Sequence, residues 1–143
     1  MTPAKDNRPT SASDDDKPVV LVVEDEVLIR MVIADYLRDC GYHVVEAGNG
    51  REAISLFEAG MEIDVVFSDV QMPGDTDGFA LARWVRSNRQ GVKVILTSGV
   101  VRISEAAEEL CEDGPLMQKP YEASEVERRI KLLIAVRANS KSH

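Results

Sequence analysis

The stretch Asp64-Val65-Val66-Phe67-Ser68-Asp69-Val70-Gln71-Met72-Pro73-Gly74 decides the fold of this chain. Its first part is a short run of β-branched and aromatic residues that ends where polar residues and Pro-Gly begin, which predicts a buried strand. Asp69 then lies at the carboxyl end of that strand, the edge of an open α/β sheet where ligands and chemistry collect. Taken alone, an aspartate in this position is most often the start of a turn.

Three other predicted strands end in reactive or charged side chains, as the 64–69 stretch does. These are Glu24 and Asp25 after 19–23, Thr97 and Ser98 after 94–96, and Lys119 after 116–118. Because the carboxyl ends of parallel strands meet at one edge of a sheet, we expect these side chains to form a single site.

Predicted strands and helices alternate along the rest of the chain. The strands are expected at 19–23, 42–46, 64–69, 93–96 and 116–118, and the helices at 27–40, 51–59, 79–88, 103–110 and 124–137. Ser124 and Glu127 have the spacing of a capping box at the start of the last helix. This alternation predicts an α/β fold, a five-stranded parallel sheet with five helices distributed over both faces.

Length and composition bound the domain organisation. The chain of 143 residues is long enough for one domain, and its 44% hydrophobic and 29% charged residues suit a soluble globular protein. We expect a disordered tail at 1–17, one domain at 18–137 and a polar tail at 138–143. No apolar run reaches membrane-spanning length, and the first residues lack the apolar core of a secretory signal.

Charge and cysteine usage narrow the partners and the compartment. A formal net charge of -8 argues against nucleic-acid binding, because phosphate backbones attract basic surfaces. Cys40 and Cys111 lack metal-ligand spacing and lie near the ends of predicted helices, so both are expected to be buried thiols. These features favour a cytoplasmic protein without a membrane or nucleic-acid partner.

Three carboxylates at one sheet edge need a cation. Glu24, Asp25 and Asp69 would all be ionised at neutral pH and would repel one another. Mg²⁺ fits such an all-oxygen set, and a Mg²⁺ ion held by carboxylates is a place for a phosphoryl group. Lys119 adds a positive charge for the same oxygens, and Thr97 adds a hydroxyl donor. Either Asp69 accepts the phosphoryl group covalently, or the site binds a phosphorylated small molecule.

Five motifs together resemble the receiver domains of two-component response regulators, which have a flavodoxin-like, doubly wound fold. They are Val-Val-Glu-Asp-Glu at 22–26, Ser-Asp-Val-Gln-Met-Pro-Gly at 68–74, Asp-Gly at 77–78, Leu-Thr-Ser-Gly at 96–99 and Gln-Lys-Pro-Tyr at 118–121. They follow the family's order and lie at the expected strand ends, and the resemblance covers about residues 19–137.

The resemblance implies a role for each of the matching residues. Asp69 would be the phosphoacceptor, Asp25 a direct Mg²⁺ ligand, Glu24 a ligand mainly through metal-bound water, and Gln71 a ligand through its backbone carbonyl. Lys119 would pair with the phosphate and precede a cis Pro120, while Thr97 and the Ser98 backbone N–H would move toward the phosphoryl group and switch the surface.

The function implied is that of a single-domain response regulator rather than an enzyme. It would take its phosphoryl group from a histidine kinase or phosphotransfer protein, require Mg²⁺ and signal to a protein target. A homodimer through the predicted fourth helix, fifth strand and fifth helix is also implied as possible. The chain departs from the family at Leu116, where an aromatic residue is usual, and in the 70–76 loop, which is one residue longer than the common length.

Three alternatives carry different sequence signals. A hydrolase with an Asp nucleophile normally has a second Asp two residues later, but position 71 is Gln. A nucleotide- or flavin-binding module needs a glycine-rich first loop, where this chain has Glu24, Asp25 and Glu26. A degenerate receiver that binds a partner without phosphorylation stays open because of Leu116.

Overall fold

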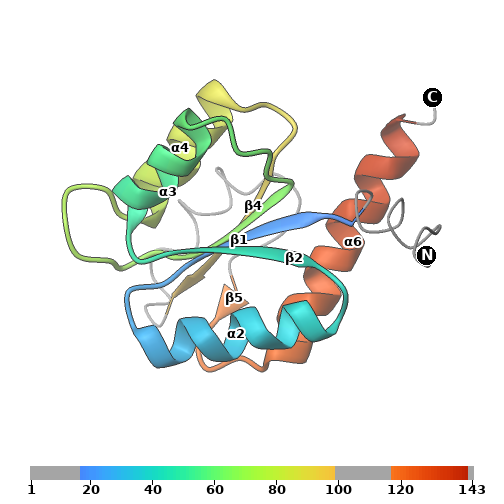
Figure 1. Ribbon diagram of the computed structural model, residues 1–143, viewed down its shortest axis with the longest axis horizontal. Helices are drawn as coiled ribbons and strands as arrows, with labels where there is room; N and C mark the ends of the chain where they lie inside the picture. The colour runs from blue at the N-terminus through green and yellow to red at the C-terminus, as the bar shows by residue number, and fades with distance from the viewer. Residues whose placement is uncertain (1–16, 99–116, 142–143) are drawn as a thin grey trace, which may run out of the picture.

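The computed structural model describes residues 17–98 and 117–141 (Figure 1). Its elements are β1 (Val19–Val23), α2 (Val27–Asp39), β2 (His43–Ala47), α3 (Gly50–Glu58), β3 (Val65–Asp69), α4 (Gly78–Asn88), β4 (Lys93–Ser98), β5 (Met117–Gln118) and α6 (Ala123–Lys141). The five strands form one parallel sheet in the order β2-β1-β3-β4-β5. The predicted α/β class with a five-stranded parallel sheet is confirmed.

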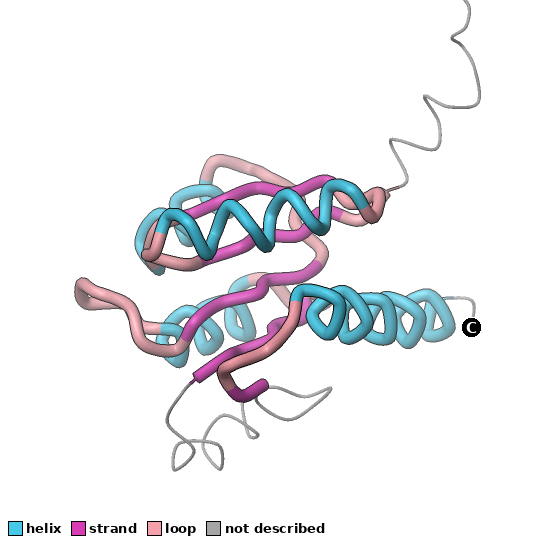
Figure 2. The backbone as a smooth tube through the Cα atoms, turned by 90° about the horizontal axis from the view of Figure 1, so that it is seen from below, coloured by secondary structure: helices cyan, strands magenta, loops and turns pink. Residues whose placement is uncertain are grey.

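Helices cover both faces of this sheet. In Figure 1, α3 and α4 lie above the strands and α2 lies below them, while α6 begins below the strands and rises at the right. Figure 2 views the molecule from below, the side of α2. The side chains of β1 alternate accordingly: Val20 and Val22 pack toward α2 and α6, whereas Leu21 and Val23 pack toward α3 and α4. Both faces of the strand are therefore buried, which explains its uninterrupted apolar sequence.

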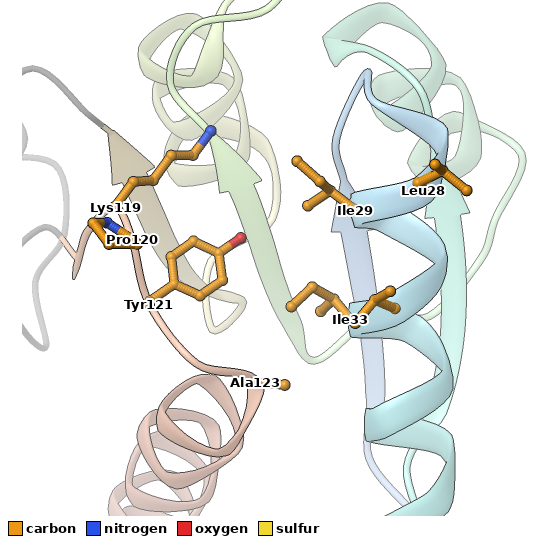
Figure 3. A pocket seen from close by; sticks show the side chains of 8 residues that line it. Leu28, Ile29, Ile33, Lys119, Pro120, Tyr121 and Ala123 are labelled. Carbon is orange, nitrogen blue, oxygen red and sulfur yellow. The ribbon is translucent and has the colours of Figure 1, made fainter.

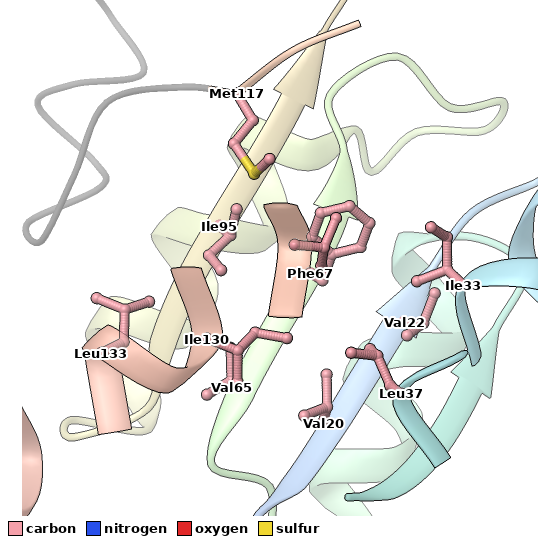
Figure 4. Close-up of a cluster of buried hydrophobic side chains, with 11 residues drawn as sticks. Val20, Val22, Ile33, Leu37, Val65, Phe67, Ile95, Met117, Ile130 and Leu133 are labelled. Carbon is pink, nitrogen blue, oxygen red and sulfur yellow. The ribbon is translucent and has the colours of Figure 1, made fainter. Parts of the chain in front are cut away.

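One apolar core lies between the sheet and the pair α2 and α6. Phe67 of β3 lies within it (Figure 4). The rings of Phe67 and Tyr121 pack edge to face, with centroids 5.6 Å apart. The buried members are Val20, Val22, Ile33, Leu37, Val65, Phe67, Ile95, Met117, Val126, Ile130 and Leu133. This packing holds the chain that follows β5 against the centre of the sheet.

Three local predictions are wrong. α6 begins at Ala123, so Ser124 lies inside the helix, and it is Glu125 whose carboxylate accepts a hydrogen bond from the Glu122 backbone N–H at 3.0 Å. The capping interaction therefore lies two residues earlier than expected, and the helix continues to Lys141, beyond the predicted end at 137. Cys40 is exposed rather than buried, because it follows the last turn of α2 on the solvent side.

Some predictions lie outside the described residues. They concern the tail at 1–16, the helix at 103–110 with its part in a homodimer, Cys111 and Leu116. Within residues 17–98 and 117–141, none of the helices combines the length and the apolar character needed to cross a membrane.

Candidate functional site

Four strands deliver the predicted site residues to one edge of the sheet. Asp69 is the last residue of β3, the central strand, and pairs in register with Thr97 of β4. Glu24 and Asp25 follow β1, the neighbour of β3 on its other side, and Lys119 follows β5. The order β2-β1-β3-β4-β5 reverses direction between β1 and β3, and this is where a doubly wound sheet opens a crevice for ligands.

The three carboxylates form a cluster that can hold a metal ion. One oxygen of each of Glu24, Asp25 and Asp69 lies within 4.8 Å of the other two. Glu24 is 4% exposed and Asp69 6%, whereas Asp25 is exposed to solvent. Oxygen donors in a cluster that is open on one side suit Mg²⁺, which keeps several of its waters when it binds. The donor set therefore fits the predicted cation.

The cluster carries an electrostatic cost in the absence of a cation. Burial raises the pKa of the Glu24 carboxyl, and the charges of Asp69 and Asp25 raise it further. The Glu26 backbone N–H, which donates to Glu24 Oε2 at 3.1 Å, and the charge of Lys119 lower the same pKa but do not outweigh burial and repulsion. A bound dication would relieve this strain directly.

Lys119 supplies the positive charge of the site. Its Nζ lies 2.9 Å from Asp69 Oδ2, in an ion pair in which the Asp69 side chain is buried and Lys119 is about one-third exposed. Burial lowers the pKa of Lys119, but the hydrogen bond and charge of Asp69, together with Glu24 and Glu26, prevail and raise it. The following Lys119–Pro120 peptide bond is cis, as the resemblance implies.

Thr97 and Ser98 end β4 beside the phosphoacceptor candidate. Both are buried, and the Thr97 backbone carbonyl accepts a hydrogen bond from the Val70 N–H at 2.9 Å. Within the described part of the chain, Thr97 Oγ1 is the buried side-chain oxygen or nitrogen that has no hydrogen-bond partner. A buried hydroxyl in this state is available to a group that enters the site, because leaving it unpaired costs free energy.

The loop from β3 to α4 closes tightly over the end of β3. The Gln71 backbone N–H donates to Asp69 Oδ1 at 3.3 Å, so the residue predicted to offer its carbonyl lies beside the carboxylate. Gly78 donates to the Val70 carbonyl at 2.8 Å, and a Cβ on Gly78 would lie 2.5 Å from the Asp69 carbonyl oxygen. Only glycine allows this approach, which explains the Asp-Gly pair at the start of α4.

An apolar groove of about 670 Å³ adjoins Lys119 (Figure 3). Figure 3 shows Tyr121 between Lys119 and the α2 residues Ile29 and Ile33. Burial raises the pKa of Tyr121 to about 12, and the nearby charges of Glu24 and Asp69 add to this shift. On the α2 side of the groove, Leu28 is 76% exposed and Val32 63% exposed, so this helix presents apolar side chains to solvent.

All the predicted site residues within the described chain gather at this edge. Sequence reasoning missed the groove and missed Arg30, which donates to the Glu24 backbone carbonyl at 2.7 Å. The groove could have been found from α2 itself, which has apolar residues on more of its surface than one buried stripe needs. Nothing in the sequence marks Arg30, because a long side chain can reach many partners.

Comparison with known proteins gives a consistent result. The sequence profile of the response regulator receiver domain matches residues 20–131. The transcriptional regulatory protein PdtaR of Mycobacterium tuberculosis is 37% identical over 131 residues, which cover 89% of this chain and 62% of PdtaR. The sensor kinase CckA of Brucella abortus is 41% identical over 98 residues, 67% of this chain and 10% of CckA. The chain thus spans less than two thirds of the length of these relatives.

Solved structures share the fold. The response regulator TrrA from Thermotoga maritima, crystallised in complex with Mg²⁺-BeF, has a TM-score of 0.72 and 29% identity over 81% of this chain and 98% of TrrA. A CheY-like receiver domain protein from Methanospirillum hungatei has a TM-score of 0.79 at 21% identity, over 87% of this chain and 98% of that protein. This chain belongs to the response regulator receiver domain family of two-component signalling.

Proposed function

We propose that this protein accepts a phosphoryl group on Asp69, in a Mg²⁺-dependent reaction, and relays the signal to a protein target. The observation that carries the proposal is the position of Asp69. Its buried carboxylate ends the central strand, is paired with Lys119 at 2.9 Å and lies within 4.8 Å of oxygens of Glu24 and Asp25. The Asp69 carboxylate thus lies beside one cation, the Lys119 side chain, and beside the carboxylates that would bind a second cation, Mg²⁺.

The proposed transfer is a displacement at phosphorus. An Asp69 oxygen attacks the phosphorus of a donor phosphohistidine, the P–N bond breaks, and its electron pair stays on the imidazole nitrogen, which takes up a proton. Asp25, Asp69 and the Gln71 carbonyl would hold a Mg²⁺ ion, with Glu24 supporting it mainly through metal-bound water. This ion would supply positive charge to the phosphoryl oxygens. Lys119 would bind another of these oxygens while it remains close to Asp69.

Thr97 is the proposed sensor of the new charge. Its buried Oγ1 has no hydrogen-bond partner among the described residues, so a phosphoryl oxygen on Asp69 would offer this hydroxyl a hydrogen bond. Ser98 would contribute its backbone N–H. The resulting movement at the end of β4 biases the chain that follows and so alters the surface that a target recognises.

The groove beside Lys119 is the proposed docking surface for the phosphodonor protein. Its apolar lining includes Lys119 of the site, and acidic residues neighbour the lining residues in the sequence: Glu26 lies two residues before Leu28, and Glu122 lies between Tyr121 and Ala123. A helix with an apolar stripe and basic neighbours complements such a surface. Leu28→Ser should slow transfer from an autophosphorylated histidine kinase but leave phosphorylation by acetyl phosphate unchanged, whereas Leu132→Ser on α6 should alter neither rate.

The phosphoacceptor proposal is tested by incubating the wild type and Asp69→Asn with acetyl phosphate, with and without Mg²⁺, and measuring intact mass. We expect one phosphoryl adduct on the wild type only when Mg²⁺ is present, and none on Asp69→Asn. A folded wild-type protein that forms no adduct would favour a binding module that works without phosphorylation. An adduct that persists in Asp69→Asn would assign the chemistry to another residue.

A further inference from the structure

Arg30 connects α2 to the acidic turn that precedes it. Its guanidinium Nη1 donates to the Glu24 backbone carbonyl at 2.7 Å, and its Nε donates to Glu46 Oε1 at 3.2 Å. The Arg30 side chain is only 19% exposed, so this arrangement is largely shielded from water. A partly buried hydrogen bond from a charged donor is among the stronger ones that proteins make.

The contact with Arg30 is one of three hydrogen bonds that hold Glu24 in place. The Glu24 backbone N–H donates to the Ala47 carbonyl at 3.1 Å, the Glu24 carbonyl accepts from Arg30, and the Glu24 carboxylate accepts from the Glu26 N–H at 3.1 Å. The first contact continues the pairing of β1 with β2. Of these three contacts, the one with Arg30 is made to the carbonyl oxygen of the Glu24–Asp25 peptide, so it restrains that peptide plane next to Asp25.

Arg30 is itself held in place from two directions. Glu46, on β2, receives Arg30 on one carboxylate oxygen and Arg38 on the other, each at 3.2 Å. Gly48, in the turn after β2, lies so close that a Cβ there would be 3.4 Å from Arg30 Nη1. The β2 strand and its turn therefore keep the guanidinium aimed at the Glu24 carbonyl.

We propose that Arg30 is a positioning residue for the divalent-cation site: it holds the Glu24–Asp25 peptide so that both carboxylates stay directed at the ion. The inference rests on the proposed Mg²⁺ binding by these carboxylates. The proposal predicts a change in Mg²⁺ affinity that is opposite in sign to the change that charge alone would cause. A cationic side chain near a cation site weakens cation binding by repulsion, so its removal should tighten binding if charge alone mattered. Loss of a positioning contact should weaken it.

Arg38 offers a matched control. It carries the same charge, shares Glu46 and sits on the same helix, but it donates to the Val44 carbonyl instead of Glu24. Eight residues separate it from Arg30, which is about 12 Å along a helix. Arg38→Ala therefore removes the charge and one Glu46 contact but leaves the acidic turn tethered.

The experiment is a Mg²⁺ titration of the full chain followed by amide chemical shifts of Asp25, Asp69 and Gln71. We expect Arg30→Ala to weaken Mg²⁺ binding on the order of 10-fold, as removal of a group that orients a metal ligand typically does. Arg38→Ala should leave the affinity within about twofold of wild type, since eight helical residues separate Arg38 from Arg30. Unchanged or tighter binding by Arg30→Ala would overturn the proposal and reduce Arg30 to a surface charge.

A second measurement needs no metal. In EDTA, amide hydrogen exchange at Glu24 and Glu26 should be faster in Arg30→Ala than in Arg38→Ala, although the two variants unfold at similar temperatures. Exchange that is equal in the two variants would refute the tether even if the wild type binds Mg²⁺. If the wild type binds no Mg²⁺ at all, the proposed function fails, and the exchange data still decide whether Arg30 fixes the turn.

Discussion

Replacing Glu24 by Gln should stabilise the protein in the absence of a divalent cation. Glu24 is buried beside Asp69 and Asp25, and burial followed by their charges raises its pKa, so its ionisation at neutral pH opposes folding. Glutamine removes the charge but keeps an oxygen that can accept the hydrogen bond from the Glu26 N–H. The variant therefore isolates the electrostatic cost of the site with little loss of packing.

The expected size of this stabilisation follows from the distances between the carboxylate oxygens. The carboxylate oxygens lie within 4.8 Å of one another, a separation at which two like charges repel by about 0.9 kcal/mol in bulk water and about 3.5 kcal/mol at an effective dielectric constant of 20. Lys119 offsets part of this repulsion. We therefore expect Glu24→Gln to raise the free energy of unfolding by about 1–3 kcal/mol in EDTA, for charges between these two dielectric limits.

Thermal and urea unfolding in EDTA and in Mg²⁺ provide the assay. Mg²⁺ at about 100 times its Kd should stabilise the wild type by about 2.7 kcal/mol. It should stabilise Glu24→Gln by less, so the advantage of the variant shrinks or reverses. The control is Glu62→Gln, because Glu62 is an exposed acid that precedes β3 at the opposite edge of the sheet. This substitution should change neither the stability in EDTA nor the stabilisation by Mg²⁺.

The pH dependence gives an independent check on the same reasoning. A carboxyl whose pKa is raised on folding leaves the folded state most favoured below its ordinary value, here 4.5, and loses that contribution as the pH rises through the raised pKa. The advantage of Glu24→Gln in EDTA should therefore vanish as the pH falls below 4.5. A variant that is less stable than wild type in EDTA at neutral pH would refute the account of a strained acidic cluster.

Three further predictions concern the rest of the site. Thr97→Val should leave the stability of the unphosphorylated protein unchanged or raise it by about 1 kcal/mol, since the buried hydroxyl has no partner, and a clear loss in urea unfolding would contradict this. Gly78→Ala should lower the free energy of unfolding by about 1–3 kcal/mol and slow phosphorylation, because its Cβ would lie 2.5 Å from the Asp69 carbonyl oxygen. A stability and a phosphorylation rate equal to those of the wild type would show that the loop adjusts freely. Lys119→Met should destabilise the protein in EDTA by about 1–3 kcal/mol, which is less than for a fully buried ion pair because Lys119 is partly exposed. Stability equal to that of the wild type would show that Asp69 does not need Lys119 as its partner.

The strand ends could be predicted from the sequence because two simple patterns agree there. Asp69, Thr97 and Lys119 each lie within two residues of the end of a short apolar run. A parallel sheet with right-handed crossovers brings such ends together whatever the loops do. The resemblance to receiver domains rests on the same residues. Topology thus carries most of the information about which side chains share the site.

The capping pair of the last helix was predicted wrongly because two pairs of residues have the same spacing. Ser124 and Glu127 have capping-box spacing, but so do Glu122 and Glu125, and the structure uses the latter pair two residues earlier. A capping contact is worth only about 1 kcal/mol, so the spacing alone does not choose between the two pairs.

The sequence of α2 shows an excess of apolar residues, but it does not show which of them line the groove. α2 carries apolar residues around much of its circumference, and burial takes only Ile33, Ala34 and Leu37 fully. Periodicity alone fits more than one apolar stripe, so it does not tell that Leu28 and Val32 face solvent. Which stripe is buried depends on where α6 lies, and that is a tertiary fact.

The most direct test of the central claim identifies the residue that carries the phosphoryl group. The wild type is treated with acetyl phosphate and Mg²⁺, the acyl phosphate is reduced with borohydride, and proteolytic peptides are sequenced by mass spectrometry. Phosphorylation of Asp69 predicts homoserine at position 69, with Glu24 and Asp25 recovered unchanged and no reduction product when Mg²⁺ is omitted. Reduction at Glu24 or Asp25 instead, or reduction at Asp69 that is independent of Mg²⁺, would contradict the account.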